Sequence, residues 1–219
     1  YGEPMVGRIL ERLSRCESVD AIILAIPKND QNTPLKNLAE KYGTSLFLGP
    51  EEDVLGRFFL ASHEHNLDFV VRFPADNPLP EPKEIDKIIC HHKKLKRKGF
   101  SSNIAEINGS GYPDGIGAEV FDFDLLAEVN LKEKRKNLRE HVHLNFFDYA
   151  EGMPVDETWC PVSTVECPEE FARPDLILDV NTKAQYLTLS RLFADLYPKN
   201  PNFGILDIIK WHKLEGLIV

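Results

Sequence analysis

One segment in the first half of the chain reads Phe69-Val70-Val71-Arg72-Phe73-Pro74-Ala75-Asp76-Asn77-Pro78-Leu79. Its apolar beginning, residues 69–73, predicts a buried β-strand. An acidic residue, Asp76, follows within three residues of that strand and stands between two prolines. A carboxylate at the carboxyl end of a strand is well placed to hold a divalent cation against a phosphate. The alternative interpretation is that Asp76 caps the turn or helix that follows, which is a common use of Asp-Asn-Pro.

Strands and helices alternate around this segment. An almost continuous apolar run at residues 19–26 predicts a strand that is buried on both faces. Alternation at spacings of about 25 residues is typical of parallel βαβ units whose helices cover the sheet. The first half is therefore predicted to be an open α/β sheet, with strands at 19–26, 45–48 and 69–73 and helices at 4–16, 33–43, 53–65 and from Pro82 onwards.

The second half is less regular, and its pattern predicts a mixture of short elements. We expect one helix that contains Leu138, Val142, Phe146 and Tyr149, because these residues recur at helical spacing. The sequence shows neither an internal repeat nor a linker, so we expect a single domain over residues 1–219. The other expected elements are strands at 118–121, 162–165 and 176–180 and helices at 182–196 and 205–214.

A second acidic residue, Asp179, ends the predicted strand at 176–180 shortly before a helix. Two acids at different strand ends can face one another across a crevice and share a cation, so Asp76 and Asp179 are candidate metal ligands. The alternative is that Asp179 or Asn181 only caps the helix.

Two arginines, Arg57 and Arg72, are expected near the same crevice. Guanidinium groups suit phosphates and sugar carboxylates, although each residue could equally be an ordinary surface arginine. Together these features favour an α/β enzyme that handles an anionic ligand with a divalent metal.

The composition excludes several classes of protein. The chain has 219 residues, a formal net charge of −9 and 42% hydrophobic residues, which suits a globular domain rather than a disordered or fibrous chain. The acidic balance argues against a nucleic-acid partner. The longest apolar run, residues 21–26, is far shorter than the roughly 20 residues of a membrane helix, so we expect no membrane partner. Four cysteines without a C-x-x-C pair indicate reduced thiols and a cytoplasmic location.

A set of strings spread over nearly the whole chain carries a family resemblance. The strings are residues 2–13, 52–58, 70–72, 76–79, 102–103, 113–115, 119–121, 139–142, 173–176 and 180–182. In this order they resemble the spore-coat polysaccharide synthesis group of cytidylyltransferases, which are relatives of acylneuraminate and 3-deoxy-manno-octulosonate cytidylyltransferases. The resemblance implies a three-layer α/β/α sandwich of the nucleotide-diphospho-sugar transferase type, with a mostly parallel sheet.

The resemblance also implies a reaction and a set of site residues. The reaction would transfer CMP from CTP to an acidic sugar, release pyrophosphate and serve the synthesis of surface polysaccharide. Asp76 would be the principal Mg²⁺ carboxylate, Asp179 a second metal ligand, and Arg72 a catalytic neighbour of the nucleotide, with Arg57 as a further nucleotide contact. The sugar side would be formed by Asn103, Asp114, Glu119, Arg139, Glu140 and His141.

The chain departs from the family pattern in two places. Relatives begin with a strand and a nucleotide-binding loop, whereas this sequence starts just after them; we therefore expect roughly 20–30 further N-terminal residues, because one βα unit needs about that many. Asn181 stands where relatives usually have a carboxylate, and Asp179, two residues earlier on the same side of a strand, could substitute.

Two other functions stay open at this point. One is the transfer of another nucleotide, such as UMP or dTMP, to a sugar phosphate. The other is a non-catalytic protein that binds a nucleotide, a sugar or a partner. The resemblance further suggests a homodimer formed through residues 103–161, with Phe146, Phe147 or Trp159 exposed at the contact; the alternative is that these three residues belong to the core.

Overall fold

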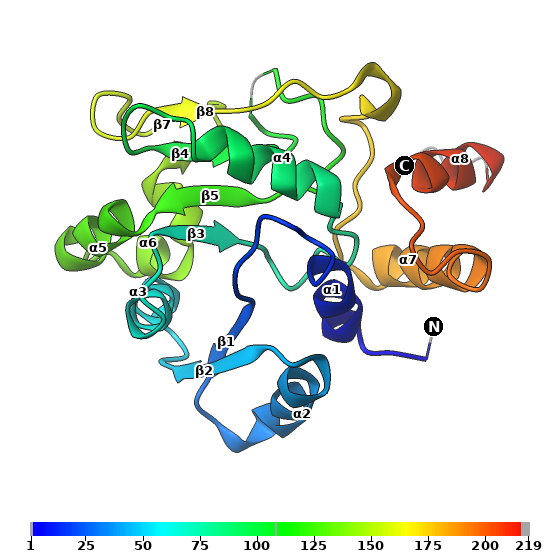
Figure 1. Cartoon of the computed structure of the whole chain (residues 1–219), viewed down its shortest axis with the longest axis horizontal. Helices are drawn as coiled ribbons and strands as arrows, with labels where there is room; N and C mark the ends of the chain where they lie inside the picture. The colour runs from blue at the N-terminus through cyan, green and yellow to red at the C-terminus, as the bar shows by residue number, and fades with distance from the viewer. Residues whose placement is uncertain (1, 108, 216–219) are drawn as a thin grey trace.

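A computed structural model describes residues 2–107 and 109–215 (Figure 1). Two strands at one end form a small parallel sheet, with Ile23 paired to Ser45 and Pro27 to Gly49. Helices α1, α2 and α3 lie around this pair. The bounds are α1 Met5–Leu13, β1 Ile23–Pro27, η1 Asp30–Asn32, α2 Thr33–Tyr42, β2 Ser45–Gly49 and α3 Val54–Glu64.

A four-stranded sheet forms the centre of the molecule, in the order β3-β5-β4-β8. Strand β5 is antiparallel to both of its neighbours, and β4 and β8 are parallel. The chain passes from β4 to β5 through a loop without a crossover helix, and it therefore returns in the opposite direction. The bounds are β3 Phe69–Arg72, α4 Pro82–His92, β4 Phe100–Ser102, β5 Glu119–Asp122, α5 Phe123–Lys132, α6 Lys136–Glu140 and β8 Val162–Ser163.

Apolar side chains cover this sheet on both faces. Helix α4 buries Ile85, Ile88 and Ile89 against Val120 of β5. A second cluster includes Phe121 of β5 and side chains from α3, α5 and the segment after α6. The sheet therefore lies between two helical layers, which confirms the α/β/α class; it is mixed rather than mostly parallel.

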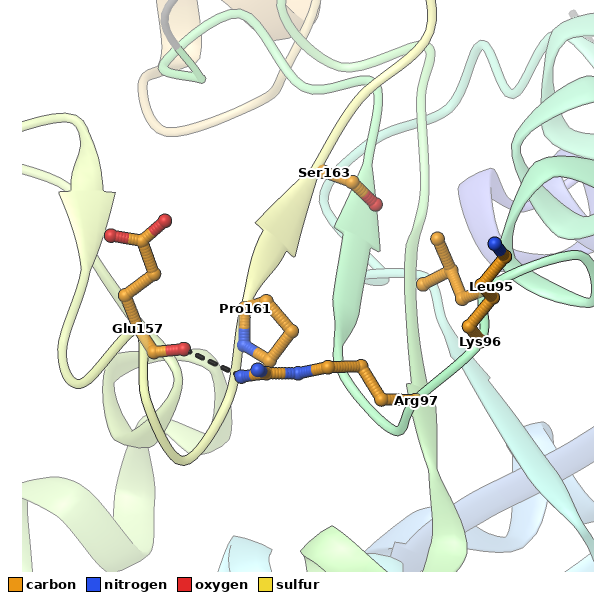
Figure 2. Close-up of a pocket in the computed structure, with 6 residues that line it drawn as sticks. All are labelled: Leu95, Lys96, Arg97, Glu157, Pro161 and Ser163. Carbon is orange, nitrogen blue, oxygen red and sulfur yellow. Dashed lines mark hydrogen bonds between the residues drawn. The ribbon is translucent and has the colours of Figure 1, made fainter.

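The edge strand β8 borders a shallow hollow of about 240 Å³ (Figure 2). Arg97 lies across Pro161 and donates a hydrogen bond from Nη2 to the backbone oxygen of Glu157 at 2.7 Å. Ser163 lines the hollow, and its hydroxyl lies 2.9 Å from that of Ser101 on β4. None of the residues predicted for the functional site lines this hollow.

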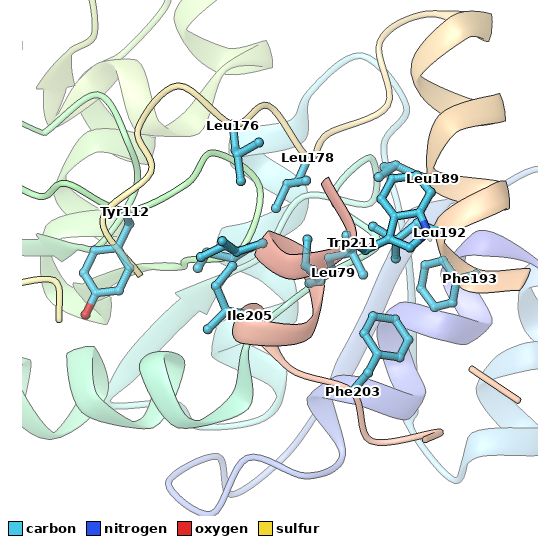
Figure 3. Close-up of a cluster of buried hydrophobic side chains, with 13 residues drawn as sticks. Leu79, Tyr112, Leu176, Leu178, Leu189, Leu192, Phe193, Phe203, Ile205 and Trp211 are labelled. Carbon is cyan, nitrogen blue, oxygen red and sulfur yellow. The ribbon is translucent and has the colours of Figure 1, made fainter. Parts of the chain in front are cut away.

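The C-terminal part packs on a third apolar cluster, shown in Figure 3. Leu176 and Leu178, from the segment before α7, lie against residues of α7 and α8 such as Leu189 and Trp211. This packing fixes the segment that carries Asp179. The remaining bounds are η2 Val142–Asn145, β6 Phe147–Asp148, β7 Met153–Pro154, η3 Glu169–Phe171, α7 Lys183–Leu196 and α8 Ile205–Glu215.

Most of the expected helices and strands of the first half are confirmed within a few residues, but the expected single parallel sheet is wrong: β1 pairs with β2, whereas β3 pairs antiparallel with β5 in the other sheet. Helix α2 ends at Gly43, which adopts φ 63° in the left-handed region. Asp53 caps α3 by accepting a hydrogen bond from the amide of Gly56 at 2.9 Å. Strand β1 differs from the prediction, because only Ile26 in it is buried; β2 is its only partner strand among the described residues.

The expected helix over Leu138 to Tyr149 is wrong. Helix α6 ends at Glu140, and a 3-10 turn and strand β6 follow. The side chain of Asn145 donates to the backbone oxygens of Leu138 and Val142, which competes with helical hydrogen bonds. The segment 176–180 is likewise not a strand and makes only an isolated bridge between Ile177 and Asp114. Strand β4 and helix α5 were not predicted.

The apolar residues proposed for a dimer contact lie in the core. Phe146 and Phe147 are fully buried, and Trp159 stacks on Phe146 with ring centroids 6.0 Å apart. Phe146 and Phe147 therefore belong to the core, and Trp159 is partly buried against it. The four cysteines are free thiols, and no helix in residues 2–107 and 109–215 has the length and apolar character needed to cross a bilayer.

Candidate functional site

A hollow of about 310 Å³ lies at the carboxyl end of β3. It is lined by the loop after β3, the segment from Ile104 to Glu119, the turn η2 and the segment before α7. Six of the predicted site residues line it: Arg72, Asp76, Asp114, Glu119, His141 and Asp179. Three further titratable residues were not predicted for the site: Glu106, His143 and Tyr149.

Asp76 and Asp179 are brought together by a backbone contact. The amide of Val180 donates to the backbone oxygen of Asp76 at 2.9 Å, which joins the loop after β3 to the segment before α7. The Asp76 side chain is exposed and accepts no hydrogen bond within the described residues, so it caps neither a turn nor a helix there. Asp179 accepts hydrogen bonds from the side chains of Asn181 and Gln185. Helix α7 is capped instead by Thr182.

Negative charge is crowded in this hollow. Burial raises the pKa of Asp114 to about 6, and Glu106, Asp179 and Asp76 add to the increase. The pKa of Asp179 is also raised, by burial and then by Asp76. Partial desolvation, followed by the charges of Glu119 and Asp179, raises the pKa of Glu106. The carboxylates therefore repel one another, and a cation bound among them would relieve this repulsion.

The residues of the hollow fit a magnesium ion. Within the described parts of the chain, no three acidic, histidine or cysteine side chains converge as a complete metal site. Mg²⁺ does not need such a cage, because it usually binds one or two carboxylates and takes its other ligands from water and substrate phosphates. Asp76 and Asp179 can supply these carboxylates, and the raised pKa of Asp179 indicates an unmet need for positive charge.

The opposite wall is built by the pairing of β3 and β5. Arg72 and Glu119 are directly paired across the two strands, and Arg72 Nη1 donates to Glu119 Oε1 at 2.6 Å. The hydroxyl of Tyr149 donates to the same oxygen at 2.8 Å. Burial and the charge of Glu119 raise the pKa of Tyr149, which keeps its hydroxyl protonated. Arg72 has further N–H groups beyond this single bond, and they can serve a ligand.

His143 lies beside this group. Its ring meets that of Tyr149 edge-on, with centroids 4.6 Å apart. Burial, followed by the charges of Arg72 and His141, lowers the pKa of His143 to about 3, so its imidazole is neutral at physiological pH. His141 is exposed and lines the hollow two residues earlier.

Arg139 lies outside the hollow and connects two helices. Its guanidinium binds Asp53 through two hydrogen bonds of 2.9 and 2.7 Å, from Nε and Nη2. It also donates to the backbone oxygens of Asn130 and Glu133. Burial alone would raise the pKa of Asp53. The hydrogen bonds from Arg139 and from the amide of Gly56 outweigh this effect, so the pKa is lowered. These contacts indicate a structural role that ties α6 to the start of α3.

Three other predicted residues also lie outside the lining of the hollow. Asn103 is fully buried, donates to the backbone oxygen of Glu84 and accepts from the amide of Ala118, both at 3.0 Å. Arg57 donates to the backbone oxygen of Pro50 at 2.6 Å and thereby supports the loop before α3. Glu140 is exposed at the end of α6. Their contacts with nucleotide or sugar stay predictions.

Comparisons with known proteins show which sequences and folds this chain is similar to. A family model described as cytidylyltransferase matches residues 1–166. The spore coat polysaccharide biosynthesis protein SpsF of Bacillus subtilis is 26% identical over 190 residues, which cover 86% of this chain and 73% of that protein.

Two solved structures have the same fold. A cytidylyltransferase from Leptospira borgpetersenii aligns with a TM-score of 0.85 and 22% identity, over all of this chain and 87% of the other. A CMP:2-keto-3-deoxy-manno-octonic acid synthetase in complex with CTP aligns with a TM-score of 0.61 and 14% identity, over 89% of each chain.

Proposed function

This chain belongs to the cytidylyltransferase family, and we propose that it transfers CMP from CTP to an acidic sugar with release of pyrophosphate. The observation that carries the proposal is the meeting of Asp76, Asp179 and Arg72 in one hollow at the end of β3. The name of the related SpsF protein supports a role in the synthesis of surface polysaccharide.

We propose that Asp76 and Asp179 hold Mg²⁺. When bound, this ion neutralises the charge of the triphosphate and of the departing pyrophosphate. Arg72 contributes a second positive charge, since one N–H group binds Glu119 and the others can bind phosphate oxygens. Catalysis then rests mainly on positioning and charge neutralisation, as in other phosphoryl transfers.

The sugar is proposed to bind on the side of Asp114, Glu119 and His141, which line the hollow beyond Arg72. This side is rich in carboxylates, so the acid group of the sugar needs a positively charged neighbour. Among the lining residues Arg72 carries a positive charge, and the proposed cation would be a second positive neighbour. The sugar must therefore lie with its acid group toward them and its remaining surface toward Glu119.

Two properties of the working enzyme belong to the same proposal. We place the reaction in the cytoplasm, where the four cysteines stay reduced thiols. A homodimer through residues 103–161 would have to use exposed side chains of that region such as Met153 and Val155, because Phe146 and Phe147 are fully buried and Trp159 packs against the core. Light scattering of the purified protein distinguishes a dimer from a monomer.

The test is a pyrophosphate-release assay with the full protein. We expect release from CTP only when both an acidic sugar and Mg²⁺ are present. A panel that replaces CTP by UTP or dTTP, and the acidic sugars by sugar phosphates, tests the other enzyme reaction. Binding of CTP and Mg²⁺ in calorimetry, without turnover of any sugar in the panel, would show a non-catalytic protein instead.

A further inference from the structure

One oxygen of the Glu119 carboxylate, in the wall of the hollow, is buried and has no hydrogen-bond partner within the described residues. Glu119 is 3% exposed, and both of its hydrogen bonds, from Arg72 and Tyr149, go to the Oε1 atom. The other oxygen, Oε2, is buried and has no hydrogen-bond partner within the described residues. A buried acceptor without a donor costs free energy, so such an atom in a binding site indicates a ligand that supplies the donor.

A second buried polar atom of this wall also lacks a hydrogen-bond partner. His143 Nδ1 is buried and has no hydrogen-bond partner in residues 2–107 and 109–215. The ring contacts Tyr149, which also binds Glu119, so one aromatic side chain links the two groups. The neutral ring keeps a lone pair on one of its nitrogens and can therefore also accept a hydrogen bond.

The charge of the wall limits which group of a ligand can bind there. Ionised phosphates and carboxylates offer only acceptor oxygens and would be repelled by Glu119. An ammonium group offers donors, but the Arg72 guanidinium already lies 2.6 Å from Glu119 and would repel a second cation. A neutral donor is left, and hydroxyl groups are the neutral donors that every sugar carries.

We infer that Glu119 Oε2 accepts a hydrogen bond from a hydroxyl group of the acceptor sugar, with His143 as a second acceptor beside it. The acceptor is therefore a polyhydroxylated sugar that enters with hydroxyl groups toward Glu119 and with its acid group turned away from Glu119, toward the further N–H groups of Arg72 and the proposed cation. The inference rests on the proposed function for the nature of the acceptor, and it adds which part of the sugar each wall recognises.

The first test is the variant Glu119→Gln. The side chain keeps its shape and one acceptor oxygen for Arg72 and Tyr149, whereas the new amide nitrogen can only donate. We expect the KM for 2-keto-3-deoxy-manno-octonic acid, or for the best acidic sugar of the panel, to rise about 10-fold or more, because a hydrogen bond to a charged group is lost. The KM for CTP should change by less than about twofold, because the variant keeps an acceptor oxygen for Arg72 Nη1 and leaves the further N–H groups of Arg72 in place for the phosphates.

The matched control is Glu157→Gln, the same chemical change in the exposed hollow of Figure 2. This control should leave both KM values unchanged. A purely structural role of Glu119 would raise both KM values together and lower the melting temperature. Such a result, or an unchanged KM for the sugar, would overturn the inference.

The second test does not depend on turnover. Crystals of the full chain are soaked with 2-keto-3-deoxy-manno-octonic acid and, in parallel, with D-mannose, which has hydroxyl groups and no acid group. We expect a hydroxyl oxygen of each sugar within hydrogen-bond distance of Glu119 Oε2. An acid-group oxygen at that place, or no sugar in the hollow, would contradict the inference. If no acidic sugar is turned over with CTP, the proposed function fails, while the position of the soaked hydroxyl still decides this inference.

Discussion

The backbone oxygen of Asp76 accepts a hydrogen bond from the amide nitrogen of Val180 at a distance of 2.9 Å. The two residues are far apart in the sequence, and this bond places the carboxylates of Asp76 and Asp179 in one hollow. Leu176 and Leu178, packed against α7 and α8, hold the second segment in position. The contact thus connects the apolar core of the C-terminal part to the site where we expect the cation.

We predict that Asp76→Asn loses activity by about 100-fold or more, the scale seen when one strong electrostatic stabiliser of a transition state is removed. The exposed Asp76 side chain makes no hydrogen bond within the described residues, and its charge helps to raise the pKa values of Asp114 and Asp179, so the melting temperature should stay the same or rise slightly. Pyrophosphate release and thermal unfolding are measured on the same preparation, with Glu157→Gln as the control. Full activity in the Asn variant would remove Asp76 from the mechanism.

The pKa of Asp114 predicts a dependence of stability on pH. Its pKa is raised to about 6 in the folded protein from an ordinary value of 3.8. Folding therefore favours the protonated carboxyl; this contribution to stability is complete below about pH 4 and is lost as the pH rises through 6. Asp114→Asn removes the repulsion, so the variant should be more stable than the wild type at pH 8 and equal to it at pH 4.

Solvent that enters the hollow screens the charge of Asp114, so we expect a gain of about 1 kcal/mol at pH 8 rather than the full effect of the shift. For a chain of this size, about 1 kcal/mol corresponds to roughly 2–4 °C in the melting temperature. The comparison is made with a chelator present, because a bound cation would relieve the same repulsion. Equal melting temperatures of variant and wild type at pH 8 would contradict the account of crowded carboxylates.

Gly117 has no room for a side chain. A Cβ atom there would lie 2.6 Å from Asn103 Oδ1 and would also meet the backbone oxygen of Asn103. Asn103 is fixed by its bonds to Glu84 and Ala118, so it cannot move aside freely. We predict that Gly117→Ala lowers the free energy of unfolding by about 1–3 kcal/mol.

The matched control for this change is Gly204→Ala. Its Cβ would lie 3.3 Å from Glu81 Oε2, a looser contact than the 2.6 Å at position 117. Denaturant unfolding should show a smaller loss in this control than in Gly117→Ala. A larger loss in the control would mean that the tight contact with Asn103 is not what excludes a side chain at position 117.

Arg139 gives a prediction about stability. Arg139→Met removes the paired hydrogen bonds to Asp53 and leaves the backbone oxygens of Asn130 and Glu133 without this donor. We expect the free energy of unfolding to fall by about 1–3 kcal/mol. Urea unfolding measures the loss. An unchanged midpoint would show that the ion pair between α6 and α3 contributes little, and would reopen the role of Arg139 in binding the sugar.

The sequence predicts the individual helices and strands of the first half well because their signals are local, but it does not predict that β3 joins a different sheet from β1 and β2. Asp53 and Gly43 mark helix ends, and the apolar residues of β3 directly precede Asp76. Arg72 and Asp76 could therefore be assigned to the end of a strand from the sequence alone. The burial of β1 could not be assigned, because an apolar run does not show which strands and helices will flank it.

The other residues of the site depend on tertiary packing. Glu106 lies in a loop, His143 in a 3-10 turn and Tyr149 in the turn after the short strand β6, and no hydrophobic periodicity in these segments predicts that the three residues share a face. The roles within the string Arg139-Glu140-His141 could not be predicted from the sequence either. Helix α6 ends at Glu140; Arg139, before this end, binds Asp53, and His141, after it, lines the hollow. Neighbours in sequence thus have different roles, which only the three-dimensional structure separates.

The most direct test of the account is a crystal structure of the full chain with CTP and Mn²⁺ in place of Mg²⁺, because the anomalous signal of manganese locates the ion. The account predicts one peak within coordination distance of both the Asp76 and the Asp179 carboxylates, with triphosphate oxygens completing its ligands. A peak elsewhere, or CTP bound while Asp76 points away from it, would contradict the assignment of this hollow as the nucleotidyl-transfer site.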